Sequence, residues 1–104
     1  MTTSVNFQLQ KKSQDQPPIV TIIIPVRNEG ANLRISLKFL AALVEVHYEV
    51  LLVYDFPTDS SVPVVKELNI DYPQFKLVLN TRGVGASYAL LAGIEAAKGD
   101  YISL

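Results

Sequence analysis

Apolar residues along this chain fall into short runs separated by stretches with a different spacing. Nearly continuous runs rich in Val, Ile and Leu occupy residues 19–25, 48–54 and 75–79, and another run begins at residue 101. Short runs of this kind are typical of strands buried on both faces of a parallel sheet. Between the runs, apolar residues recur every three or four positions, as in a helix with one face on a core. The sequence therefore predicts the order β-α-β-α-β-α-β.

Three helices are predicted between these strands. The first begins at Ala31 or Asn32, and the second covers residues 62–68. The third covers residues 86–98 and ends at Gly99, because glycine readily adopts the left-handed conformation after a last helical turn. The apolar positions are Leu33, Leu37, Leu40, Ala41 and Val44 of the first helix, on which Arg34 and Lys38 should face water, then Val62, Val65 and Leu68 of the second, and Leu90, Leu91, Ile94 and Ala97 of the third.

Strands joined by helical crossovers pair in parallel, and the crossovers are right-handed. The expected fold class is α/β, a Rossmann-like parallel sheet with flanking helices, formed by residues 19–104 as one domain. Residues 1–18 are mostly polar and end in Pro17-Pro18, so they are predicted to form a flexible N-terminal leader. A short edge strand over residues 5–9 is the alternative for that segment.

The composition of the chain excludes several classes of function. The 104 residues are 49% apolar with a mean hydropathy of +0.25, which is enough for a substantial core. Nine basic and ten acidic residues give a net charge of −1, so the chain lacks the basic surface of a nucleic-acid-binding protein. No apolar run approaches the roughly 20 residues of a membrane span. The absence of cysteine excludes disulfides and thiolate metal sites and fits a cytoplasmic location.

Polar residues gather where three predicted strands end. Arg27-Asn28-Glu29 follows the first strand, residues 55–61 follow the second, and Asn80-Thr81-Arg82 follows the third. The carboxyl ends of parallel strands share one edge of the sheet, and ligands bind there in open α/β folds. Helix N-termini also point at this edge and favour anions. A nucleotide is therefore the natural ligand of these clusters.

Each cluster also has a purely structural interpretation. Asp55 is a common kind of turn residue after a strand, and Asn28 and Glu29 could serve only to cap the first helix. The Gly83-Val84-Gly85 pattern lacks the third glycine of a dinucleotide fingerprint. His47 has no cysteine or carboxylate at a spacing typical of metal ligands.

Taken together, three segments resemble a known family. They are VTIIIPVRNE, VLLVYDFPTDSS and NTRGVGASYALLAGIEAAKGDYISL. They are similar to the P-x-x-N-E, V-D-D-G-S-T-D and N-x-G-x-G-A-x-x-x-G-x-x-x-A-x-G-D-Y blocks of family 2 nucleotide-sugar glycosyltransferases, which have the GT-A fold. The resemblance covers residues 19–104. The sequence of residues 82–87 is most similar to that of the polyprenyl-phosphate (dolichyl-phosphate) sugar transferases, one branch of the family. This resemblance leaves open that the full-length protein is associated with the cytoplasmic face of a membrane.

The resemblance implies a set of nucleotide-binding residues. The P-x-x-N-E segment would line the nucleotide pocket, a carboxylate after the second strand would accept the ring N–H of uracil or guanine, and the loop after the third strand would close over the nucleotide. The residues at these positions are Pro25, Val26, Arg27, Asn28 and Glu29, then Asp55, then Arg82, Gly83 and Gly85.

The chain departs from the family pattern in two ways. Tyr54 replaces the first aspartate of V-D-D, and Phe56-Pro57 replaces G-S. In the family, a D-x-D motif that binds Mg²⁺ or Mn²⁺ and a catalytic base lie beyond the position of Leu104. We therefore expect this chain to be the nucleotide-binding half of an inverting transferase that uses a UDP- or GDP-sugar. It would be truncated before D-x-D, with no catalytic residue or metal ligand of its own, and would be inactive without the missing half.

Two other functions remain compatible with the residues. One is a non-catalytic module that binds a nucleotide, or that only assembles with another subunit through the open edge of its sheet. The other is a sugar nucleotidyltransferase, which would need a glycine-rich loop with Arg or Lys directly after the first strand. Residues 26–30 do not supply that loop.

Overall fold

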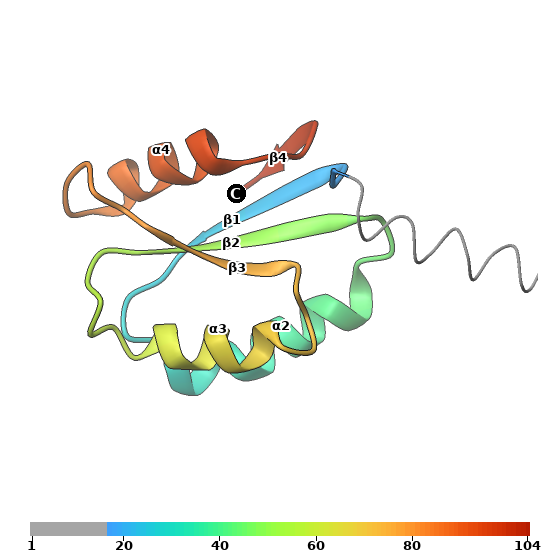
Figure 1. Ribbon diagram of the computed structural model, residues 1–104, viewed down its shortest axis with the longest axis horizontal. Coiled ribbons are helices and arrows are strands. Elements are labelled where there is room, and N and C mark those ends of the chain that lie inside the picture. Colours follow the sequence, from blue (N-terminus) through green and yellow to red (C-terminus); the bar gives the residue numbers. More distant parts are fainter. Residues whose placement is uncertain (1–16) are drawn as a thin grey trace, which may run out of the picture.

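The computed structural model describes residues 17–104. The predicted leader, except Pro17 and Pro18, and the alternative strand over residues 5–9 lie outside this range. The described residues form one parallel sheet in the order β3-β2-β1-β4, with β2 and β1 in the middle (Figure 1). The fold class is α/β, as predicted. The strands are β1 (Val20–Pro25), β2 (Tyr48–Tyr54), β3 (Phe75–Leu79) and β4 (Tyr101–Ser103).

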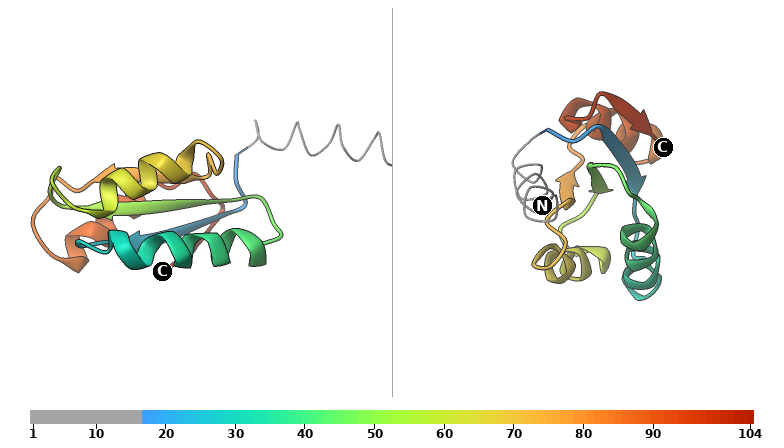
Figure 2. Two further views of the ribbon diagram at one scale, coloured as in Figure 1. Left: turned by 90° about the horizontal axis from the view of Figure 1, so that it is seen from below. Right: turned by 90° about the vertical axis from the view of Figure 1, so that its right-hand side faces the viewer.

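Helices cover both faces of this sheet. Helices α2 (Gly30–Leu43) and α3 (Ser61–Asn69) lie side by side on one face, and α4 (Ala86–Ala96) lies on the other (Figures 1 and 2). Alternation along β2 explains the two layers, because successive side chains of a strand point to opposite faces. Val50 and Leu52 pack with α2 and α3, whereas Leu51 and Val53 pack with α4.

The bounds of β2 and β3 are those predicted. The buried faces of the first two helices are also confirmed, since the apolar stripes of α2 and α3 lie on the sheet. Lys38 is exposed, as predicted, and Arg34 is partly exposed. The guanidinium of Arg34 also forms an ion pair with Glu67 of α3, which joins the two helices across their exposed sides.

Helix α4 packs differently from its predicted apolar pattern. Its buried residues are the small ones, Ala89, Ala92 and Gly93, while Leu91 and Ile94 are about half exposed. A Cβ atom on Gly93 would lie 2.5 Å from Cγ2 of Ile23, so the helix backbone comes close to β1. The helix also ends at Ala96, two residues before the predicted end.

Gly99 has a different role from the one predicted. Among residues 17–104, glycines with positive φ are Gly83 and Gly85, so Gly99 is not a left-handed cap. A Cβ atom on Gly99 would lie 2.6 Å from the backbone nitrogen of Thr21. Glycine is needed there because the turn after α4 passes directly against β1.

None of the helices in the part of the chain that the structure describes has the length and apolar character of a membrane span.

Candidate functional site

Three loops meet at the carboxyl edge of the sheet. They follow β1, β2 and β3, which are neighbours and run in parallel. Two backbone hydrogen bonds continue the ladder beyond the strands: Val26 N–H donates to the carbonyl of Val53 at 2.9 Å, and Asn80 N–H donates to the carbonyl of Tyr54 at 2.8 Å. The three polar clusters found in the sequence are therefore brought to one edge, as predicted.

The buried carboxylate of Asp59 holds the first two loops together. It accepts the backbone N–H of Asn28 with both oxygens, each at 3.0 Å, and its Oδ1 also accepts the N–H of Ser61 at 2.7 Å. Burial by itself would raise the pKa of Asp59, but the N–H donors of Ser61 and Asn28 outweigh it, and this pKa lies below its ordinary value. The positive charge of Arg27 acts in the same direction.

Asn28 returns a hydrogen bond to the second loop. Its Oδ1 accepts the N–H of Ser60 at 3.1 Å, and its backbone has the left-handed φ of +50° that Asn tolerates better than most residues. The hydroxyls of Ser61 and Ser60 accept the N–H groups of Glu29 and Gly30 at 3.0 and 3.3 Å. The first amides of α2 are thus bonded to the start of α3. Neither Asn28 nor Glu29 caps α2 with its side chain. The N–H of Gly30, the first residue of α2, is bonded to the Ser60 hydroxyl instead.

Asn80 organises the second and third loops. Its buried side-chain amide donates to Oδ1 of Asp55 at 2.8 Å and to the carbonyl of Gly83, while its Oδ1 accepts the N–H of Arg82 at 3.0 Å. Asp55 is half-buried, and within residues 17–104 its Oδ2 receives no hydrogen bond. One carboxylate oxygen is therefore fixed, and the other remains able to accept a donor from a ligand.

The remaining predicted residues lie around this pair with different orientations. Val26 is buried in the core, so only its backbone borders the edge. The guanidinium of Arg27 lies over the ring of Phe56, 5.7 Å from its centroid, in a cation–π contact. Phe56, one of the departures from the family pattern, thus supports the loop after β1. Pro25 ends β1 and is half-buried.

The glycine loop before α4 is shaped by its neighbours. A Cβ atom on Gly83 would lie 3.0 Å from the ring of Tyr88, so this glycine lets the loop pack on the aromatic face. Gly85 has a φ of +126° and stands at the N-terminus of α4, where a side chain would be strained. Arg82 does not point at Asp55. Its guanidinium forms an ion pair with Glu95 on α4.

Sequence reasoning missed the central roles of Asp59 and Asn80. In the sequence, each of them is only one member of a polar cluster that follows a strand. The sequence did contain a signal for Asp59. In the T-D-S-S ending of the second cluster, the aspartate stands directly before two serines, where its carboxylate can accept N–H groups from two neighbouring loops.

The residues present do not form a metal site. Residues 17–104 hold no group of three or more His, Asp and Glu side chains placed to bind a metal ion. The oxygens of Asp59 are also committed to backbone N–H groups. We therefore assign no metal ligand within the part of the chain that the structure describes.

Comparison with known proteins identifies the family of this chain. The family model described as Glycosyl transferase family 2 matches residues 21–104. The Escherichia coli K12 protein YibD, described as an uncharacterized glycosyltransferase, is 33% identical over 84 residues, 81% of this chain and 24% of that protein. The dolichol-phosphate mannosyltransferase of Pyrococcus furiosus is 34% identical over 82 residues, 78% of this chain and 23% of that protein.

A solved structure shows the same fold. The mannosyltransferase PcManGT from Pyrobaculum calidifontis, in complex with GDP-Man and Mn²⁺, matches 94% of this chain and 32% of its own, with a TM-score of 0.70 and 22% identity. The sheet and its helices are thus those of a GT-A fold. The chain spans about a quarter of the length of the curated relatives it matches. Since the family model covers nearly all the described residues, this chain belongs to glycosyl transferase family 2.

Proposed function

We propose that this chain is the nucleotide-binding part of a glycosyltransferase that uses a UDP- or GDP-sugar. The observation that carries the proposal is the Asp55 carboxylate, which Asn80 holds through one oxygen while the other is open. Uracil and guanine both present a ring N–H, and a carboxylate accepts such a donor in a charge-assisted hydrogen bond. A carboxylate that is already oriented loses little entropy when the base binds.

The loops on either side of Asp55 would complete the nucleotide pocket. The Arg27-Asn28-Glu29 loop is held by Asp59 and would form one wall through its backbone and Glu29. The loop with Arg82, Gly83 and Gly85 would form the other wall and bring the N-terminus of α4 toward the diphosphate. In this arrangement α4, rather than α2, offers the free helix end.

The reaction of the whole protein would be an inverting transfer. An acceptor oxygen would attack the anomeric carbon, and the nucleoside diphosphate would leave as the bond to the sugar breaks. The base that removes the acceptor proton, and the ligands of the Mg²⁺ or Mn²⁺ expected for the complete enzyme, would come from outside residues 17–104. By itself this chain would bind the nucleotide without transferring the sugar.

The names of three relatives support one class of acceptor. One relative is a dolichol-phosphate mannosyltransferase, and two are undecaprenyl-phosphate 4-deoxy-4-formamido-L-arabinose transferases. We include a polyprenyl phosphate as the acceptor in the proposal, which would place the full-length protein at the cytoplasmic face of a membrane.

Nucleotide titration of the chain tests the proposal. Calorimetry with UDP and with GDP should show binding of at least one of them. Asp55→Asn should weaken that binding about tenfold or more, because a hydrogen bond to a charged group is lost while Asn80 keeps an oxygen acceptor. Asp100→Asn, a substitution in the exposed turn before β4, is the matched control and should bind like the unchanged chain.

Two results would contradict this function. If Asp55→Asn binds as tightly as the unchanged chain, Asp55 does not recognise the base. If no nucleotide binds to a chain that is folded by circular dichroism, the alternative of an assembly module without nucleotide binding is favoured.

A further inference from the structure

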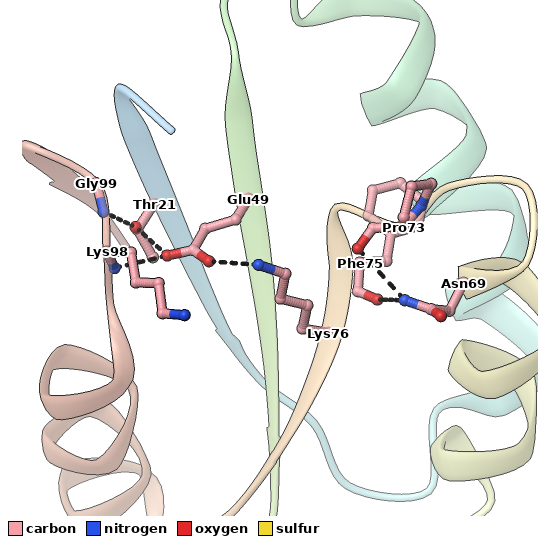
Figure 3. Close-up of polar contacts among 8 residues, drawn as sticks. All are labelled: Thr21, Glu49, Asn69, Pro73, Phe75, Lys76, Lys98 and Gly99. Carbon is pink, nitrogen blue, oxygen red and sulfur yellow. Dashed lines mark hydrogen bonds and ion pairs between the residues drawn. The ribbon is translucent and has the colours of Figure 1, made fainter. Parts of the chain in front are cut away.

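A buried carboxylate lies at the amino end of the sheet, opposite the candidate nucleotide edge. Glu49 is the second residue of β2, and only 2% of its surface is exposed. Its Oε2 accepts the backbone N–H of Lys98 and the hydroxyl of Thr21, each at 2.7 Å, and its Oε1 accepts Nζ of Lys76 at 3.1 Å (Figure 3). The carboxylate therefore joins β1, β2 and β3 to the segment that follows α4.

A second hydrogen bond extends this contact by one residue. The N–H of Gly99 donates to Oγ1 of Thr21 at 2.8 Å, and the Thr21 hydroxyl in turn donates to Glu49 (Figure 3). Linked hydrogen bonds of this kind polarise and strengthen one another. Two residues of the turn before β4 are thus fixed, Lys98 directly by Glu49 and Gly99 through Thr21.

Strand β4 has few other contacts that would fix its register. It has three residues, all of them exposed, and it pairs only with β1 among the described strands. A strand is normally held in register by the residues that it buries, and a slip of one residue is costly because it exposes them. Within the described residues β4 buries no side chain, so its backbone pairing with β1 and the contacts of the preceding turn are the restraints on its register.

Core stability alone does not explain a carboxylate at this position. Burying a charge costs several kcal/mol unless its hydrogen bonds are complete, and a well-packed apolar residue often stabilises a protein equally well. Lys76 is about half exposed, so its ion pair with Glu49 is partly screened by water. The backbone N–H of Lys98 and the hydroxyl of Thr21 are the donors that an apolar residue could not replace.

We propose that Glu49, with Thr21, is a positioning residue that sets the register of β4 against β1. Because β4 runs parallel to β1, its carboxyl end points to the edge that holds Asp55. Glu49 would therefore determine, from the far end of the sheet, where the residues at the end of β4 lie relative to the nucleotide. This last consequence rests on the proposed function, whereas the register of β4 does not.

Amide hydrogen exchange measured by NMR on the whole chain tests the positioning role. Glu49→Met removes both oxygen acceptors at similar volume. In this variant, exchange should accelerate about tenfold or more at Lys98 and at Tyr101, whose N–H donates to the carbonyl of Ile19 at 3.0 Å. The amide of Val50 is the internal reference, because it donates to Gln74 on the other side of β2. Its exchange should change much less.

Substitutions at Thr21 and Lys76 separate the parts of the network. Thr21→Val removes the acceptor of the Gly99 amide and should accelerate its exchange strongly, with a smaller effect at Lys98. Thr21→Ser keeps the hydroxyl and should restore protection. Lys76→Met, the matched control, removes the ion pair and should leave the Lys98 and Gly99 amides protected. If Glu49→Met does not fold, the valine and serine variants of Thr21 test the same hydrogen-bond network.

The proposal is overturned if Glu49→Met and Thr21→Val leave the exchange of these amides unchanged. It is also overturned if exchange at Lys98, Gly99 and Tyr101 rises only by the factor measured at Val50, since that would be general destabilisation. Neither result depends on nucleotide binding. A chain that fails to bind UDP and GDP but shows the selective loss of protection would refute the proposed function and support the role of Glu49 in register.

Discussion

The side-chain amide of Asn80 donates to Oδ1 of Asp55 at 2.8 Å, and this contact joins the loops after β2 and β3. The two residues are far apart in the sequence, but backbone pairing of β2 with β3 brings them together. Asn80 has a second task, because its other atoms hold the turn that contains Arg82 and Gly83. One buried amide therefore positions both Asp55 and the Arg82–Gly85 wall that the proposed nucleotide would touch.

Replacing this amide should affect nucleotide affinity without removing any group proposed to bind the nucleotide. Asn80→Ala leaves Asp55 without its donor and Arg82 N–H without its acceptor, so we expect a loss of about 1–3 kcal/mol in the free energy of unfolding. Affinity for UDP or GDP should fall several-fold as well. Chemical denaturation and calorimetry measure the two effects.

Asn69→Ala is the matched control for this prediction. The Asn69 amide also holds a backbone segment, through the carbonyl of Phe75 at 2.7 Å and that of Pro73 at 3.3 Å, but at the opposite end of β3 (Figure 3). The Asn69→Ala substitution should destabilise the fold and leave nucleotide affinity unchanged. Equal losses of affinity in the two variants would show that the Asn80 contact has no special importance for the site.

Asp59 should make the stability of the chain depend on pH in the acidic range. Its pKa is lower in the folded chain, so the folded state favours the charged form more than the unfolded state does. This contribution is present in full above the unfolded pKa of about 3.9 and is lost as the pH falls through the lower folded value. Asp59→Asn should therefore cost about 1.5–3 kcal/mol at pH 7 and much less at pH 2.

Urea denaturation across this pH range measures the difference between the two chains. Glu49 contributes in the same direction, because hydrogen bonds outweigh the effect of its burial and lower its pKa. The unchanged chain and Asp59→Asn share that contribution, so it cancels in the comparison. A difference between them that stays constant from pH 7 to pH 2 would refute the assigned role of the Asp59 carboxylate.

The sequence predicted most reliably those elements whose apolar residues face a core on both sides. The runs that form β2 and β3 are each apolar apart from one charged residue near the start, Glu49 and Lys76, and both strands begin and end where predicted. The carboxyl-edge clusters also came together, because parallel pairing leaves them no other edge. Periodicity and strand order were sufficient for these features.

Features that depend on one close contact could not be predicted. The apolar positions of α4 included Leu91 and Ile94, yet the helix packs through its small residues because Gly93 allows it to approach Ile23. Gly99 was interpreted as a cap, but it makes room for the backbone of Thr21. In each case the partner belongs to β1, far away in the sequence, and no local pattern identifies it.

Gly93→Ala should destabilise the chain, against the usual effect of this substitution. Within a helix, alanine is normally favoured over glycine by up to about 1 kcal/mol. Here the added Cβ atom would lie 2.5 Å from Cγ2 of Ile23, and overpacking of this kind typically costs about 1–3 kcal/mol. Thermal unfolding should show a lower Tm, and an increase would mean that α4 does not pack closely on β1.

The ion pair between Arg82 and Glu95 should compete with nucleotide binding. Both side chains are well exposed, and the guanidinium is directed to α4 rather than to Asp55. A diphosphate that recruits Arg82 would first have to separate it from Glu95. Glu95→Gln removes that competition and should tighten UDP or GDP binding about two- to fivefold at low salt, in line with the modest strength of surface ion pairs.

The gain should shrink at high ionic strength, because salt screens exposed charges. Glu45→Gln changes the net charge equally at an exposed position beyond the end of α2, and it should leave affinity unchanged. In a chain that also carries Arg82→Gln, Glu95→Gln should have no effect. If Glu45→Gln and Glu95→Gln tighten binding equally, the cause is net charge. If the gain persists without Arg82, this arginine does not contact the nucleotide in the way proposed.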